Sequence, residues 1–506
     1  MKFDVVVVGG GGTGVAAAIG ARSAGASVVL LEKNATLGGT TARSIGSISA
    51  TQTADQKRVG IVDTPAEHFE DMGKFSQHHA DRPDNGELAR ILCDNVPESV
   101  RLLEEWGAVF LGPMDEPPHR KPRMHQIMPN SAAYIFHAEK HARKIGVEIL
   151  TNARARKLLT ANGEVSGVEM QRDGNAEAIK AIEATKGVIL ASGDYAADPG
   201  FKAQFVSEAV AATEAVNPTN TGDGHRMALD LGARIINPDM YGGGMRFVRP
   251  ATPAWQSRLP PSAWLMRLCN AVMRHAPQSL VRHFIMSFMT TVMVPERKMF
   301  QQGAILINAR GERFADENQR MVFELALQPE GVGYILLDAA TAKKFNQWPN
   351  YVSTAPGVAF AYLSDYERTR PDLFHRGATL DEVARLLNMD VGVLMQTIAA
   401  YNRGEGLPGR AIGRDERPPV GDGPYVVLGP VKNYINYTDG GLAVNSQLQV
   451  LGKNDVPIPR LYAAGATGQG GLLLKGHGNH IGWGFTSGRL AGQYAAALAP
   501  RAEQVS

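Results

Sequence analysis

Three glycines near the start of the chain have a spacing suited to binding a dinucleotide. Gly9, Gly11 and Gly14 form the pattern G-x-G-x-x-G directly after the apolar run 3–8. In this pattern the first glycine permits a tight turn, the second lets the backbone approach a pyrophosphate, and the third lets a helix pack closely on a strand. Glu32 ends a second apolar run and is placed to bind a ribose hydroxyl. A 2′-phosphate at that position is disfavoured because two anions would meet.

The segments around these residues predict the elements that position them. An apolar run (3–8), a glycine turn, an alanine-rich stretch (16–25) and a second apolar run (27–32) follow one another. This order predicts strand, helix and strand, with the helix N-terminus directed at the phosphates. Short strands are also expected at 147–150, 165–170 and 186–195, and a strand followed by glycines returns at 460–471. The predicted fold class is therefore α/β, with a Rossmann-like domain split in sequence.

Length and composition limit the class of protein. A chain of 506 residues holds two or three domains, and a net charge of +2 gives no field for nucleic acid. Cys93 and Cys269 support neither a metal site nor a disulfide framework. The first strand starts at residue 3 and no run of eighteen apolar residues exists, so we expect a cytoplasmic protein without a signal peptide or spanning helix.

The middle of the chain predicts a second domain. Residues 236–422 contain proline clusters, long polar stretches and a helical segment at 379–402. We therefore expect a nucleotide domain formed by 1–235 and 423–506, with 236–422 inserted between its two parts. Residues 262–295 are rich in methionine, and apolar residues recur there at helical spacing. Three interpretations stay open: a lid over a bulky substrate, a helix lying on a membrane surface, or packing in a core or oligomer.

Several further motifs resemble one family. GGTT (38–41), ILASGDY (189–195), NTGDGHRMALDLGA (220–233) and INARGERFADE (307–317) are similar to segments of the fumarate reductase/succinate dehydrogenase flavoprotein superfamily, which includes the 3-ketosteroid dehydrogenases. The C-terminal segment TDGGLAVNSQLQVLG, followed by IPRLYAAGATGQGG, also matches. The resemblance implies FAD, an α+β capping domain at 236–422, and hydride exchange at flavin N5.

The resemblance also implies a set of cofactor contacts. No histidine occurs in 38–50, where quinone-linked members attach FAD covalently, so we expect noncovalent FAD. The residues implied to bind it are Gly9, Gly11, Gly12, Thr13, Gly14, Glu32, Lys33, Gly39, Thr40, Thr41, Ser44, Gly46, Ala191, Ser192, Gly193, Asp223, Gly465 and Gly482.

Two departures from the family concern the substrate. Tyr437 stands where fumarate reductases have a histidine, and His480 stands where they have an arginine. A dicarboxylate favours permanent positive charge, which neither residue supplies at neutral pH. The sequence therefore favours a less charged substrate. Arg320 is the nearest match to the family's proton-delivering arginine, displaced by about one residue.

The catalytic residues we expect are Tyr437, Tyr434, His480 and Arg320. Removing hydrogen across the α and β carbons of a ketone needs a donor to the carbonyl, a base for the α proton and a hydride acceptor. Tyrosines fill the first two roles in the 3-ketosteroid dehydrogenases. Asp439 either tunes the pKa of Tyr437 or forms a turn with Gly440. His477 is either a site residue or a turn residue.

The sequence thus predicts α,β-dehydrogenation of a cyclic or steroid-like ketone, with an unidentified electron acceptor. An enone or enoate reductase of the fumarate reductase type is the alternative. A third interpretation is an electron-transfer subunit without carbon chemistry, docked on a membrane or redox partner through 262–295. Arg123 and His125 are expected in a solvated basic loop. Oligomeric state is open.

Overall fold

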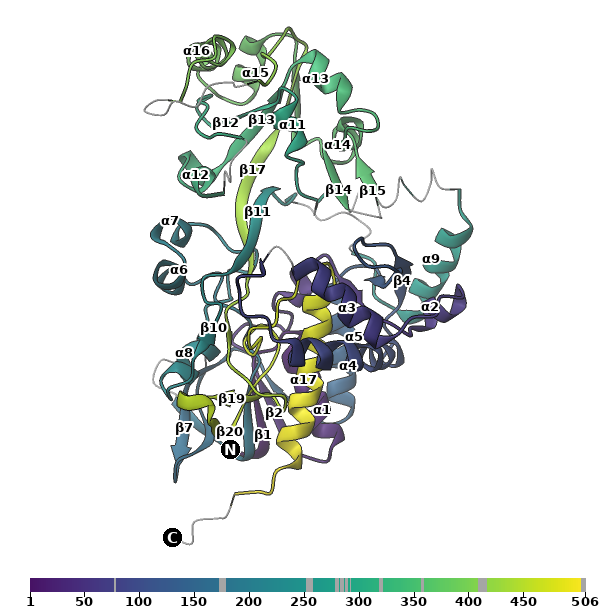
Figure 1. Ribbon diagram of the computed structural model, residues 1–506, viewed down its shortest axis with the longest axis vertical. Coiled ribbons are helices and arrows are strands. Elements are labelled where there is room, and N and C mark those ends of the chain that lie inside the picture. Colours follow the sequence, from purple (N-terminus) through teal and green to yellow (C-terminus); the bar gives the residue numbers. More distant parts are fainter. Residues whose placement is uncertain are drawn as a thin grey trace.

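The computed structural model describes residues 1–76, 79–172, 179–251, 258–277, 282, 286, 290–291, 293–317, 322–355, 359–407 and 416–501. The molecule is elongated, with both termini at one end and a second α/β unit at the other (Figure 1). Among the described residues, no helix is long and apolar enough to cross a bilayer.

The larger unit is built on a mostly parallel sheet. Its strands run in the order β20 (Pro457–Ala463), β9 (Ile179–Leu190), β1 (Lys2–Val8), β2 (Val28–Leu31) and β6 (Glu148–Leu150). β19 (Gln449–Leu451), β7 (Ala153–Ala161) and β8 (Glu164–Arg172) add antiparallel pairs. β20 comes from the far end of the sequence and pairs with β9, so the two predicted parts share one sheet. The α/β class is confirmed.

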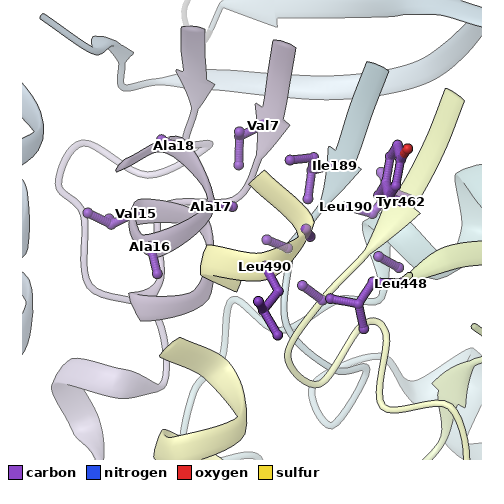
Figure 2. Close-up of a cluster of buried hydrophobic side chains, with 14 of the residues drawn as sticks. Val7, Val15, Ala16, Ala17, Ala18, Ile189, Leu190, Leu448, Tyr462 and Leu490 are labelled. Carbon is purple, nitrogen blue, oxygen red and sulfur yellow. The ribbon is translucent and has the colours of Figure 1, made fainter. Parts of the chain in front are cut away.

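Two helices of small residues cover this sheet. α1 (Gly12–Ser23) lies against α17 (Asn479–Ala497), and a Cβ on Gly492 of α17 would stand 2.1 Å from the carbonyl oxygen of Ala17. Figure 2 shows Leu490 of α17 beside the strands that carry Val7 and Ile189. The close approach of backbones explains why the sequence is rich in glycine and alanine here. This packing holds the glycine turn before α1 in place at the carboxyl end of the central strand β1.

The smaller unit contains a five-stranded sheet. β11 (Tyr241–Phe247), β17 (Tyr425–Thr438), β13 (Gly333–Leu337) and β12 (Ile305–Asn308) follow in order, and β16 (Phe374–Gly377) also pairs with β17. β17 runs from this sheet toward the larger unit (Figure 1). The predicted division at 422/423 separates β17 from the strands it pairs with; the domain boundaries stay a prediction.

The helix predicted over 379–402 is two helices, α15 (Leu380–Leu386) and α16 (Val391–Asn402). Asn388 has a left-handed backbone with φ of 54°, which ends the first helix. The Asp390 side chain accepts from the main-chain N–H of Val393 at 2.9 Å and starts the second.

The remaining elements complete the two units. Those of the larger unit are η1 (Thr41–Arg43), β3 (Ser47–Ser49), α2 (Ala54–Arg58), α3 (Pro65–Ser76), α4 (Gly86–Glu105), β4 (Phe110–Met114), β5 (Met124–Ile127), α5 (Ala132–Lys144), α6 (Pro199–Phe205), α7 (Glu208–Ala211), α8 (Asp223–Leu229), β10 (Ile235–Ile236), β18 (Gly441–Leu442) and η5 (Lys453–Asp455). α9 (Ala263–His275) is bonded to β4 of the larger unit. Those of the smaller unit are α11 (Lys298–Gln301), α12 (Val322–Ala326), η4 (Pro329–Gly331), α13 (Ala339–Lys344), β14 (Ser353–Ala355), β15 (Ala359–Ala361) and α14 (Leu363–Thr369).

Candidate active site

One large cavity of about 870 Å³ brings the predicted residues together. Its nucleotide end is formed by glycine turns and short polar side chains. Fourteen of the residues predicted to bind the cofactor line it: Gly9, Gly11, Gly12, Thr13, Glu32, Lys33, Gly39, Thr40, Thr41, Ser44, Gly46, Ala191, Ser192 and Gly193.

The nucleotide end has the shape that a dinucleotide requires. A Cβ placed on Gly11 would meet only the Cα of Gly39, at 4.0 Å. Open space therefore remains beside the Gly11 backbone, where a pyrophosphate can approach. Glu32 is buried, and its two oxygens accept main-chain N–H groups of Gly10 at 2.6 Å and Asn34 at 2.8 Å. The carboxylate is therefore fixed at the cavity wall. These residues fit the pyrophosphate and ribose of FAD.

The opposite end of the cavity is mainly apolar. Its apolar side chains include Leu111, Met114, Met124, Met128, Leu259, Met266, Cys269, Met273 and Met293. Four of these belong to the methionine-rich segment 262–295, and three of the four lie on α9. Methionine adapts its shape to irregular partners, so this wall suits a bulky apolar molecule.

A tyrosine, a histidine and an aspartate meet where β17 reaches the cavity. The rings of Tyr437 and His480 lie 4.3 Å apart, and both residues line the cavity. His480 Nε2 stands 3.6 Å from Asp439 Oδ1, while Lys475 Nζ lies 3.1 Å from Asp439 Oδ2. Asp439 is buried. Tyr437 lies on β17, Asp439 in the turn after it and His480 at the start of α17. The two glycine-rich motifs that contain these residues therefore lie close together.

The charge states of this group follow from burial and contacts. Burial disfavours the anion of Asp439, but contacts with His480, Lys475 and Gln469 outweigh it and lower the pKa of Asp439 to about 2. Burial, reinforced by Asp439, raises the pKa of the Tyr437 phenol. Tyr437 is therefore protonated at neutral pH. In this state the Tyr437 phenol can donate a hydrogen bond, and its catalytic role stays a prediction.

A second titratable pair lies on the cavity wall. His477 Nδ1 is 2.5 Å from Glu116 Oε1, and the same oxygen accepts the main-chain N–H of His477 at 2.7 Å. The hydrogen bond to Glu116 raises the pKa of His477 against the effect of burial. Both residues line the cavity. Glu116 was not singled out from the sequence, where it lies 361 positions from its partner.

An arginine of β11 also faces the cavity. Within the described residues, Nε of Arg246 is buried and has no hydrogen-bond partner. Burial and the neighbouring Arg249 lower the pKa of Arg246. A partly buried guanidinium without an anion is unfavourable, which marks a place for a negative or strongly polar group. No motif or spacing in the sequence singled out this residue.

Comparisons with known proteins identify the family. Residues 4–244 and 269–474 match the profile of the FAD-binding domain. The chain belongs to this FAD-binding family. It is 29% identical to urocanate reductase of Eggerthella lenta, over 98% of this chain and 75% of that protein. The open conformation of a flavocytochrome c3 fumarate reductase superposes with a TM-score of 0.71 at 25% identity, over 98% of this chain and 78% of that one.

A third comparison concerns the fold alone. 3-Ketosteroid Δ1-dehydrogenase of Sterolibacterium denitrificans has a TM-score of 0.62 at 19% identity, over 98% of this chain and 99% of that one. The flavoprotein superfamily and the FAD cofactor are thus confirmed, and the protein is an FAD-dependent oxidoreductase acting on carbon–carbon double bonds. Noncovalent attachment stays a prediction.

Four residues predicted to bind FAD do not line the described cavity of the flavoprotein: Gly14, Asp223, Gly465 and Gly482. They support its wall instead. A Cβ on Gly14 would stand 1.8 Å from the Gly9 carbonyl oxygen, so this glycine sets helix–strand packing. Asp223 pairs with Lys33 Nζ at 2.8 Å. Gly465 packs on Thr13, and Gly482 packs on Val96. Their direct contact with FAD stays a prediction.

Of the other predicted residues, those that the structure describes do not line the cavity. Tyr434 is not among the described residues that line it; it lies near Arg246 and Arg249, and burial raises its pKa. Arg320 lies outside the described residues. Arg123 and His125 are buried, not solvated as expected.

The burial of Arg123 has a clear electrostatic cause. Arg123 holds Asp63 through two bonds, of 2.7 and 2.8 Å, and contacts Asp71 at 2.5 Å. The two carboxylates neutralise the guanidinium, so burial is tolerated. His125 Nε2 lies 2.9 Å from Thr53 Oγ1.

Proposed function

We propose that this FAD-dependent oxidoreductase introduces a double bond between the α and β carbons of a bulky, mainly apolar ketone. The observation that carries the proposal is the protonated Tyr437 beside His480, in the same cavity that the methionines line. A neutral donor next to an apolar wall suits a carbonyl on a large hydrocarbon body.

The side chains divide the proton chemistry between them. Tyr437 donates to the carbonyl oxygen and stabilises the charge that develops there as the α proton leaves. His480 receives that proton, and the buried carboxylate of Asp439, 3.6 Å away, balances the resulting charge. Bound FAD would supply the acceptor for the β hydrogen, transferred as hydride, and an electron-accepting partner would reoxidise the cofactor.

A second candidate is the reverse reaction on an enone or enoate. The unpartnered guanidinium of Arg246 supports it, because an arginine in the cavity wall suits a substrate carboxylate. Two proteins similar to this chain, urocanate reductase and fumarate reductase, are reductases, which also favours reduction. This direction needs an electron donor in place of an acceptor. A subunit without carbon chemistry is supported only by the outer face of α9.

Anaerobic spectroscopy tests the proposal. The FAD-loaded protein is mixed with a saturated cyclic ketone, and in a second sample the chemically reduced protein is mixed with the matching enone and with an enoate. A desaturase loses its visible flavin absorbance with the saturated ketone. Recovery of that absorbance only with the enone or enoate supports the second candidate. No change with any of the three compounds contradicts both.

A further inference from the structure

The outer face of α9 is apolar and exposed. Trp264, Leu268 and Val272 are 70%, 54% and 58% exposed, and their spacing of four places them on one side of the helix. Met266, on the other side, is buried and lines the cavity. α9 is therefore apolar on both faces. We propose that the outer face docks on an anionic phospholipid surface.

The helix is held firmly in place, so its exposed face is not a consequence of loose packing. Asn270 Nδ2 donates to the carbonyl oxygen of Phe110 in β4 at 2.9 Å. Met266 packs with Val109 and Met128 in one small hydrophobic cluster. Because these contacts hold the Met266 side of α9 against the protein, the opposite side of the helix faces outward. α9 lies at the periphery of the molecule (Figure 1).

A neighbouring element also exposes apolar side chains. Val59 and Val62 follow α2 and are 49% and 81% exposed. Arg58, the last residue of α2, donates to the carbonyl oxygen of Gly112 at 3.1 Å, so α2 and α9 bond to the same strand, β4. Figure 1 shows both beside β4.

The charge of the surrounding sequence selects the kind of partner. Residues 240–295 contain six arginines and neither aspartate nor glutamate, although Arg246 lines the cavity and Arg282 pairs with Asp365, so these two do not contribute to the outer face. Arg267 on α9 and Arg258 just before it are exposed. Apolar side chains next to arginines favour a bilayer that carries negative headgroups. A second copy would bring the same arginines together across a two-fold axis, which disfavours self-association.

This inference goes beyond the proposed function and does not depend on it. One helix would contact lipid on one face and form the cavity wall on the other. An apolar compound dissolved in the bilayer would then be concentrated beside that wall. Docking itself needs neither substrate nor turnover, so it is measured on the FAD-loaded protein alone.

Vesicle sedimentation tests the inference. The full FAD-loaded chain is spun with vesicles of phosphatidylcholine alone or mixed with phosphatidylglycerol, at low and high salt. We expect sedimentation with the mixed vesicles, reduced by salt and weak with phosphatidylcholine alone. The double variant Trp264→Glu/Leu268→Glu should bind at least about tenfold more weakly. Its FAD content should equal that of the parent, which shows that it folds.

Trp348 supplies the matched control, because it is 64% exposed and lies in the smaller unit. Trp348→Glu should leave vesicle binding unchanged. The inference is overturned if the parent protein stays in the supernatant, or if Trp348→Glu weakens binding as much as the double variant. It is also overturned if size-exclusion chromatography shows a dimer that the double variant dissociates while vesicles bind neither protein.

Discussion

The two ends of the cavity are built in different ways. The nucleotide end consists largely of one continuous stretch, with backbone groups of Gly9 and Gly11 and the fixed carboxylate of Glu32. The substrate end draws Tyr437, Glu116 and α9 from parts of the chain that are far apart in sequence. One end is set by local backbone sterics, and the other by how distant elements pack.

This difference separates binding from turnover. At the nucleotide end, glycines and main-chain donors have no protonation state to change. At the substrate end, Asp439 is held anionic, the Tyr437 phenol is held protonated and His477 has a raised pKa. Substitutions at the two ends should therefore affect two different measurements, FAD retention and catalysis.

The largest expected effect tests the substrate end. Tyr437→Phe removes the donor proposed to polarise the carbonyl and leaves the ring in place. Because groups of this kind contribute about 10²–10⁴-fold, kcat should fall by that range while the ratio of bound FAD stays at the parent value. Steady-state turnover and the visible spectrum of the purified variant measure the two quantities.

Tyr434→Phe is the matched control, since this tyrosine lies on the same strand but does not line the described cavity. It should retain near-parent turnover. Equal losses in the two variants would remove Tyr437 from the mechanism and point to a general effect on β17.

The nucleotide end is tested by Glu32→Ala. The change removes the acceptor for Gly10 and Asn34 and the anion proposed to bind the ribose. Hydrogen bonds to charged groups are worth about 1.5–3 kcal/mol, so the Kd for FAD should rise by about 10–100-fold. Titration of the apoprotein measures it. With saturating FAD, kcat should recover; a kcat that stays low would break the separation between the two ends.

The sequence was sufficient where the determinants are local. The spacing of Gly9, Gly11 and Gly14 fixes a turn, a close approach and a packing contact within a few residues. Most of the implied cofactor residues therefore line the cavity. Gly465 and Gly482 show the limit, because a motif identifies a segment without telling which of its residues faces inward.

Long-range packing explains what the sequence did not reveal. His477 pairs with a carboxylate 361 positions away, a distance at which no spacing rule applies. The protonation of Tyr437 depends mainly on its burial, which only the folded protein shows, whereas the contribution of Asp439 comes from two residues away. Arg123 looks like a surface residue by composition, but Asp63 and Asp71 neutralise it inside the protein.

A smaller effect separates the two proposed reactions. Arg246→Met removes the unpartnered guanidinium but keeps an unbranched side chain in the wall. If one charge-assisted bond of about 1.5 kcal/mol holds a substrate carboxylate, kcat/KM for an enoate should fall about tenfold. For a neutral ketone it should change less than about twofold. Equal losses for the two substrates would show that Arg246 shapes the cavity but does not discriminate between a charged and a neutral substrate.

The smallest expected effect is a shift in pH dependence. Glu116 raises the pKa of His477, so the imidazolium persists to higher pH than in an isolated histidine and is lost as pH rises through the raised value. Glu116→Gln removes the anion, and the pKa should fall toward the ordinary value of about 6.5. The alkaline limb of kcat/KM should therefore move to lower pH, with little change where both proteins hold the proton.

The same substitution has a consequence for stability. In the parent, the proton-linked contribution of the pair is fully present below the unfolded pKa of histidine and disappears above the raised folded pKa. Thermal unfolding should be measured across the pH interval between these two pKa values. The parent and Glu116→Gln should differ in stability at the acidic side of that interval and not at its alkaline side. If the alkaline limbs of kcat/KM coincide while this stability difference is present, the Glu116–His477 pair is a structural contact. Proton transfer then involves Tyr437 and His480 without His477.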